Sequence, residues 1–270
     1  MSLFIRTILG LLALLVATAL PARAQDVDLL LVLASDVSRS VDTRKFELQR
    51  QGYAAALSNR RVVEAIQSGP HGKIAICFVE WSGATSVKLV IDWTVVGDAA
   101  SARKIGDQML ELPRSFADRT SISAGLEFAF AQLERSPYKA VRRTIDVSGD
   151  GTNNQGPIVN LTRDEVVAKG ITINGLPIML KEPAPGSIDI KDLDIYYEDC
   201  VIGGPGAFVV PIREREKFKE AIRTKLVLDI ADRTNEPRVI PAAAQNPRIS
   251  CTIGEQMWQR RWGSGGIDWR

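Results

Sequence analysis

Apolar and polar positions along the chain follow two different periods, and each period predicts a kind of element. The run LLLVL at 29–33 is apolar throughout, which is typical of a strand buried on both faces of a sheet. Residues 43–57 place Phe46 and Tyr53 on one apolar stripe and so predict a helix. Asp42, directly before this segment, suits its N-cap. The ordered part of the chain therefore begins with a strand followed by a helix.

The same alternation continues along the chain. Further strands are expected at 73–81, 85–93, 141–148, 171–179 and 207–212, and further helices at 98–111, from about Ser121, at 161–169, 189–198 and 214–233. A short turn joins the first two of these strands, which predicts an antiparallel hairpin. The expected fold class is α/β: a doubly wound, mainly parallel sheet with one antiparallel edge strand and helices on both faces.

Both ends of the chain differ from this pattern. Residues 1–24 combine an early arginine, an apolar core and the small-x-small triplet Ala22-Arg23-Ala24, which predicts a cleaved secretory signal peptide, with an uncleaved anchor as the alternative. The expected domain covers 25–234, and 235–270 are a Trp- and Pro-containing tail too short for a second domain. This predicts a periplasmic or secreted protein with no membrane span after cleavage.

Charge and motif content exclude several function classes. Cleavage would leave 32 basic residues against 32 acidic ones, so nothing in the net charge favours nucleic acid or an anionic membrane as a partner. The only histidine is His71, which argues against multi-histidine zinc sites and against histidine-dependent nucleophilic catalysis. The sequence also lacks GxSxG, GxxxxGK[ST] and GxGxxG, so an ordinary hydrolase or nucleotide-binding protein is not expected.

Three cysteines fall in a compartment that permits disulfides. Cys77 lies in the apolar strand KIAICFVEW and is expected to be a buried thiol. Cys200 and Cys251 both lie in irregular sequence, and we pair them by elimination.

Oxygen-bearing side chains gather where the predicted strands end. Asp36, Ser38 and Ser40 directly follow the first strand, and Asp150 follows strand 141–148. Thr120 precedes the start of a helix in a third loop. Ligands of open α/β sheets bind at the carboxyl ends of the strands, so these five side chains are expected to converge. Turn formation and helix capping are the alternative explanation of the same residues.

This arrangement resembles the von Willebrand factor type A domain and its metal-ion-dependent adhesion site (MIDAS). The family's D-x-S-x-S loop is matched by Asp36-Val37-Ser38-Arg39-Ser40, its threonine by Thr120 in DRTSISAGL, and its aspartate by Asp150 in VSGDGTNN. The later GGPGAFVVPIREREKFKEAI is similar to the family's last strand and helix, and the likeness covers about 27–233. In size and organisation the chain resembles an uncharacterised bacterial family of secreted single-domain type A proteins.

The resemblance implies a function and a cofactor. Ser38, Ser40 and Thr120 would bind the ion directly, and Asp36 and Asp150 largely through water. These hard oxygen ligands suit Mg²⁺, with Mn²⁺ or Ca²⁺ as alternatives. A Glu or Asp carboxylate of a protein ligand would complete the coordination, so a non-catalytic binding protein is expected. A Mg²⁺-dependent phosphohydrolase is the runner-up, weakened by the lack of an evident base or lysine in these loops. A structural envelope protein with an unused metal site is the third hypothesis.

Several residues near the predicted site have two interpretations each. Asp146 lies inside a strand that should be central, either paired with a neighbouring arginine or supporting the metal ligands. Glu80 could reach the same edge, although a solvent-facing side chain is the expectation. Asn153 and Asn154 either bind coordinated water or form the turn. In the tail, the tryptophans at 258 and 262 are spaced for one helical turn, and they either pack on the domain or form a docking patch.

Overall fold

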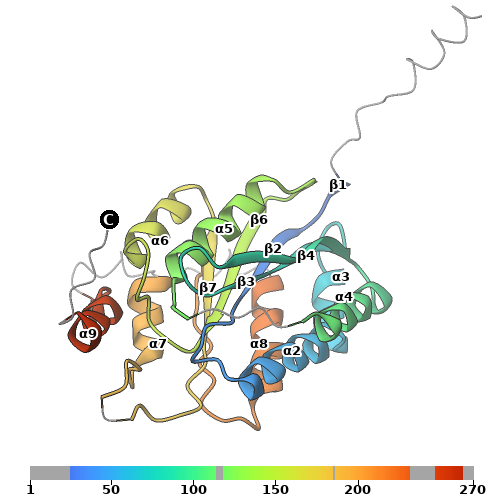
Figure 1. The fold of residues 1–270 in the computed structure, drawn as a ribbon. Coiled ribbons are helices and arrows are strands. Elements are labelled where there is room, and N and C mark those ends of the chain that lie inside the picture. Colours follow the sequence, from blue (N-terminus) through green and yellow to red (C-terminus); the bar gives the residue numbers. More distant parts are fainter. Residues whose placement is uncertain (1–24, 114–117, 185, 232–246, 264–270) are drawn as a thin grey trace, which may run out of the picture.

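A mixed five-stranded sheet forms the centre of the protein (Figure 1). The computed structural model describes residues 25–113, 118–184, 186–231 and 247–263. In the order of the sheet, the strands are β4 (Val87–Val96), β3 (Ile74–Trp81), β2 (Leu29–Asp36), β6 (Arg142–Gly149) and β7 (Thr172–Pro177). The parallel pairs join β3, β2, β6 and β7, and β4 is the antiparallel edge strand, so the predicted hairpin and fold class are confirmed.

Strand β2 occupies the middle of the sheet because its sequence has no polar face before its end. All eight of its residues are buried, and it pairs in parallel with β3 and β6. Its register sets Ser35 beside Glu80 on one side and beside Ser148 on the other, so the ends of these three strands lie together. The loops that follow β2, β3 and β6 therefore all lie at the same edge of the sheet.

Helices cover both faces of the sheet, and each face has its own hydrophobic core. One face carries α2 (Thr43–Leu57), α3 (Arg60–Gln67), α4 (Ala99–Glu111) and α8 (Phe218–Ile230). The other carries α5 (Ile122–Glu134), α6 (Val159–Ala168), the short α7 (Leu193–Tyr196) and the π-helical turn η1 (Tyr197–Val201). The last described helix, α9 (Ile253–Trp262), lies at the outer side of this second layer (Figure 1). A separate two-stranded pair joins β1 (Gln25–Asp26) and β5 (Tyr138–Lys139).

Local sequence rules account for most element boundaries. Helix α2 covers the predicted residues, and the Asp42 carboxylate accepts a hydrogen bond from the Lys45 backbone N–H at 2.9 Å. Helix α3 was not predicted, although Asn59 caps it and its apolar residues are buried. Segment 207–212 forms only single bridges beside β7, at Val209 and Ile212, instead of the predicted strand.

Some predictions fall on residues outside the described ranges. The expected signal peptide at 1–24 is one of them, as are 235–246 and 264–270 of the expected tail. Within the ranges that are described, no helix combines the length and the apolar character needed to cross a membrane.

Candidate metal site at the carboxyl edge of the sheet

The loop after β2 folds back on itself and presents a row of oxygen atoms. The Ser38 backbone N–H donates to Asp36 Oδ1 at 2.7 Å, which closes a turn directly at the strand end. The hydroxyls of Ser38 and Ser40 lie 3.1 Å apart. Ser40 Oγ in turn donates to Asp150 Oδ1 at 2.5 Å, across 110 residues of chain. The structure therefore brings four of the five predicted ligands into one continuous polar chain.

Thr120 reaches this edge through a clamp made by Asn154. The Asn154 side-chain oxygen accepts from the Thr120 backbone N–H at 3.1 Å, and the Asn154 N–H donates to the Thr120 carbonyl at 2.9 Å. A Cβ built on Gly151 would lie 4.0 Å from both Oγ1 and Cγ2 of Thr120, so the Thr120 side chain lies beside the loop that carries Asp150. Asn154 thus positions the threonine, a role that its place in a polar turn did not reveal.

Asp36 is the most unusual group of the set. Its side chain is buried, and its Oδ2 has no hydrogen-bond partner among the described residues. Burial, followed by the nearby charge of Asp150, raises the pKa of Asp36 to about 7. A Cβ at Gly149 would come within 3.1 Å of this Oδ2 and 2.8 Å of the Tyr197 hydroxyl, so the close approach requires glycine. A buried carboxylate oxygen without a partner needs an explanation, and a bound cation, a water or a proton would each supply one.

Tyr197 is a second group at this edge that the sequence did not reveal. Its ring comes from η1, a π-helical turn of the kind often found at functional sites. The phenol oxygen is buried and, like Asp36 Oδ2, has no partner in the described part of the chain. Burial, with the charge of Asp36 as the second cause, raises the pKa of Tyr197 well above its usual range. The phenol therefore stays neutral, buried close to the Asp36 carboxylate.

Lys45 also reaches the site, although sequence reasoning found no lysine there. It lies in the first turn of α2, and only 8% of its side chain is exposed. Its ammonium forms an ion pair with Asp150 Oδ2 and donates to the Ser40 carbonyl at 3.1 Å. Its signal in the sequence was weak, because a lysine early in a helix is normally solvated.

Two of the oxygen atoms have a spacing that suits a small divalent ion. Ligands on adjacent corners of an octahedron, each about 2.1 Å from Mg²⁺, lie about 3.0 Å apart, close to the separation of the two serine hydroxyls. Asp36 Oδ2, without a partner among the residues described, supplies a further acceptor at the end of the same strand. No cluster of three or more His, Cys, Asp or Glu side chains suited to a metal occurs in the described ranges. A metal here would therefore depend on hydroxyls and water as much as on carboxylates.

Glu80 and Asp146 are occupied elsewhere. Glu80 does not face solvent, contrary to the expectation: it is 1% exposed and accepts from Arg50 at 2.5 Å. Its place in β3, an interior strand of the sheet, and its ion pair with Arg50 of α2 explain the burial. Asp146 pairs with Lys225 of α8 at 2.8 Å, so its partner is a lysine and not the arginine that was considered.

Asn153 joins the loop that follows β6 and carries Asp150, here called the site loop, to α5 and α9. Its side-chain oxygen accepts from the Ser123 N–H at 3.1 Å, and its amide nitrogen donates to Glu255 at 2.8 Å. Its backbone N–H donates to the Tyr196 hydroxyl at 3.1 Å. With its side chain engaged on both sides, Asn153 holds this loop in place between α5 and α9.

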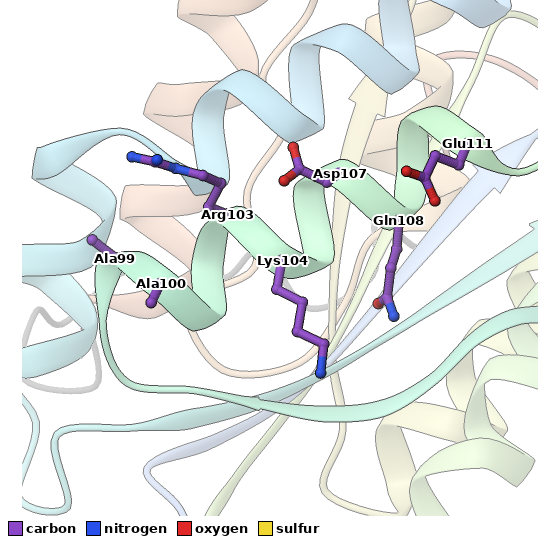
Figure 2. Close-up of a pocket in the computed structure, with 7 residues that line it drawn as sticks. All are labelled: Ala99, Ala100, Arg103, Lys104, Asp107, Gln108 and Glu111. Atoms are coloured by element: carbon purple, nitrogen blue, oxygen red, sulfur yellow. The ribbon is translucent and has the colours of Figure 1, made fainter.

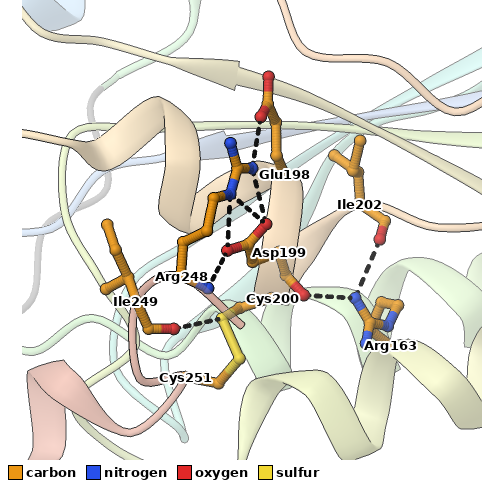
Figure 3. A network of polar contacts seen from close by, with 8 residues as sticks. All are labelled: Arg163, Glu198, Asp199, Cys200, Ile202, Arg248, Ile249 and Cys251. Atoms are coloured by element: carbon orange, nitrogen blue, oxygen red, sulfur yellow. Dashed lines mark hydrogen bonds and ion pairs between the residues drawn. A yellow bond between two sulfur atoms is a disulfide. The ribbon is translucent and has the colours of Figure 1, made fainter. Parts of the chain in front are cut away.

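A cross-linked network behind this loop anchors the segment that leads to α9 (Figure 3). Cys200 and Cys251, the pair inferred from the sequence, are joined by a disulfide. Arg248 forms ion pairs with Asp199 and Glu198, both at 2.7 Å. Arg163 of α6 donates to the backbone carbonyls of 199 and 202 at 3.2 and 3.1 Å. These contacts fix 247–251 against η1 and so carry α9 to the site.

The two tail tryptophans, Trp258 and Trp262, stack on each other but differ in their surroundings. Their rings are 4.0 Å apart between centroids, and the Arg119 guanidinium lies 3.6 Å from the Trp258 ring centre. Trp258 therefore packs against the loop that carries Thr120. Trp262 remains 46% exposed.

The surface also has a hollow of about 640 Å³ away from this edge (Figure 2). Its lining comes entirely from the outer side of α4: Ala99, Ala100, Arg103, Lys104, Asp107, Gln108 and Glu111. None of the candidate ligands contributes to it. It is an open helix surface with mixed charges, and it adds nothing to the metal site.

Comparisons with known proteins agree with the fold. Residues 26–234 match the family described as a protein of unknown function (DUF1194). Similar solved structures include a pilus adhesin, SpaC, from Lactobacillus rhamnosus GG, at a TM-score of 0.55 and 13% identity over 77% of this chain and 31% of that one. A comparison with curated proteins returned no match.

Two further structures have the same fold. A von Willebrand factor type A protein from Catenulispora acidiphila gives a TM-score of 0.51 and 14% identity over 76% of this chain and 43% of that chain. Proximal thread matrix protein 1 from the mussel byssus, described with a zinc-occupied MIDAS motif, gives a TM-score of 0.51 and 15% identity over 77% and 48%. The chain thus spans less than half the length of each of these structures, and the similarity establishes a von Willebrand factor type A fold.

Proposed function

We propose a function for this chain from the premise that it belongs to the family DUF1194 and has a type A fold. The proposed function is that of a non-catalytic binding protein that captures a protein ligand through a divalent cation. The observation that carries the proposal is the buried Oδ2 of Asp36, which has no partner in the described ranges and lies at one end of the polar chain formed by Ser38, Ser40 and Asp150. Such an atom is costly to bury unless a cation or a coordinated water binds it.

The chain's own residues divide the task of holding the ion. Ser38, Ser40 and Thr120 would offer neutral hydroxyls, and the two aspartates would hold coordinated water. An ion bound mostly by neutral groups keeps much of its charge and attracts an anionic ligand, which a partner's Glu or Asp carboxylate would supply. Mg²⁺ is the proposed ion, with Mn²⁺ or Ca²⁺ as alternatives.

The protein is proposed to work outside the cytoplasm. The leader-like pattern of residues 1–24 supports export, to the periplasm or beyond. The disulfide between Cys200 and Cys251 fits an oxidising compartment as well.

Calorimetric titration of Mg²⁺ into chelator-stripped protein tests the site. We expect saturable one-to-one binding, lost in Thr120→Val, which removes the hydroxyl and keeps the shape of the side chain. Thr120→Ser is the matched control, because it keeps the hydroxyl and should keep the ion. Equal binding by all three proteins would show that Thr120 is not a ligand.

A phosphohydrolase remains the second candidate, and Lys45 is the observation that favours it. An ammonium beside a metal site is a common device for binding phosphate. Here, however, that ammonium is already paired with Asp150. Mg²⁺-dependent turnover of p-nitrophenyl phosphate that disappears in Asp36→Ala would favour the enzyme over the binding protein.

A further inference from the structure

The feature that the proposed function does not use is the buried ammonium of Lys45. Its ion pair with Asp150 Oδ2 and its hydrogen bond to the Ser40 carbonyl hold it against two of the residues proposed to bind the ion. The side chains of Lys45 and Asp150 are only 8% and 2% exposed, so water screens this pair weakly. The backbone of Lys45 is held as well, because its N–H donates a hydrogen bond to the Asp42 carboxylate.

A divalent ion and this ammonium need the same negative charge. Asp36 and Asp150 are the two carboxylates of the proposed ligand set, and one of them already neutralises Lys45. An ion bound to the Ser40 hydroxyl would lie close to an ammonium on the same residue's carbonyl, and like charges repel strongly in such a poorly screened place. Ion and lysine therefore cannot both be bound to Asp150 without a loss of affinity.

We infer that Lys45 is a tethered cation that competes with the divalent ion for Asp150 and weakens ion binding in the absence of a ligand. This inference rests on the proposed function. An incoming carboxylate adds the missing negative charge and can accept a hydrogen bond from the released ammonium. Ligand and ion would then strengthen each other's binding, as thermodynamic linkage requires. The lysine would thus keep the site from holding its ion tightly until a partner arrives.

The experiment is calorimetric titration of Mg²⁺ into four chelator-stripped, full-length proteins: wild type, Lys45→Gln, Lys45→Met and Lys181→Met. Lys45→Gln removes the charge but keeps a hydrogen-bonding group, so it guards against loss of fold in the methionine variant. Lys181→Met is the matched control, because Lys181 is 62% exposed and pairs with Asp42 at 3.1 Å, outside the ligand set. Circular dichroism and thermal melts establish that each variant is folded.

Both Lys45 variants are expected to bind Mg²⁺ about tenfold or more tightly than wild type, a typical size for coupling between charges. Lys181→Met should bind like wild type, and acetate should strengthen binding most in the wild type. A gain in affinity is informative because structural damage would lower it. Equal or weaker binding by the Lys45 variants would overturn the competing role while leaving the ion site intact. Absence of binding in all four proteins would overturn the ion site and the competing role together.

Discussion

Two lysine side chains, Lys45 and Lys225, are buried against carboxylates at separate places in the molecule. Lysine is rarely buried unless it is paired, and both of these are. Lys225 is fully buried between Asp146 of β6 and Asp229 of its own helix, at 2.8 and 3.0 Å. Asn174 donates to Asp229 at 2.7 Å. One ammonium thus pairs with two carboxylates, and its ion pair with Asp146 of β6 holds α8 against the sheet.

Removing the ammonium of Lys225 should be far more damaging than removing a carboxylate. Lys225→Met leaves two buried carboxylates uncompensated, and we expect a loss of about 3–5 kcal/mol in the free energy of unfolding. Asp146→Asn keeps the pair of Lys225 and Asp229, and its cost at neutral pH should stay within about 1 kcal/mol. Urea unfolding of both variants measures the difference. A loss in Asp146→Asn as large as in Lys225→Met would mean that Asp146 is the essential partner.

At the scale of elements, helix α9 packs against the loop that carries Asp150 and Asn153 and supports it. It docks so closely that a Cβ on Gly254 would lie 2.0 Å from the Asn153 carbonyl oxygen. Glu255, next in the helix, accepts from the Asn153 side chain, which in turn holds α5. The disulfide between Cys200 and Cys251 closes a loop of 51 residues just before α9 and limits how far the helix can move.

Gly254→Ala should therefore displace α9 from the site loop. The added methyl group meets backbone, which cannot move aside as a flexible side chain would, so we expect a loss of about 1–3 kcal/mol. Hydrogen exchange across 247–263 should become faster, and Mg²⁺ binding should weaken as Asn153 loses its support. Gln259→Ala, at an exposed position of the same helix, is the control and should change neither. Unchanged exchange in Gly254→Ala would show that α9 does not depend on this contact.

For the whole molecule, buried carboxylates make stability depend on pH in an unusual direction. The pKa values of Asp36 and Asp146 are each raised to about 7, mainly by burial. A carboxyl whose pKa is raised on folding binds more protons in the folded than in the unfolded chain between about pH 4 and pH 7. The folded state therefore loses stability as the pH rises through this window.

Ion-free protein should accordingly unfold more easily at about pH 7.5 than at about pH 5, by on the order of 2 kcal/mol for each carboxyl. Asp146→Asn should remove its share of this dependence. Mg²⁺ favours ionised Asp36, so it should stabilise the protein more at the higher pH. Urea unfolding with chelator and with excess Mg²⁺ at both pH values measures all three effects. A free energy of unfolding that is the same at both pH values without the ion would contradict the pKa shifts.

The sequence alone determined the polar strand ends and most of the order of elements, although α3 was not predicted and 207–212 was wrongly expected to be a strand. Apolar periodicity, the N-cap Asp42 and the turn between β3 and β4 act within a few residues, so a linear pattern contains them. The convergence of the strand-end loops follows from the parallel topology that the pattern predicts. This local information was enough for the fold and for a ligand hypothesis.

Only the tertiary structure decided which charges meet. Lys45 and Asp150 are 105 residues apart, and Lys225 and Asp146 belong to different layers. Glu80 reads as a solvent-facing residue in the sequence, and only the placement of α2 over β3 gives it Arg50 as a buried partner. Such pairs depend on how distant elements pack against one another, and a local sequence pattern contains no information about that packing. The proposed competition between lysine and metal is therefore a property of the fold that no single segment encodes.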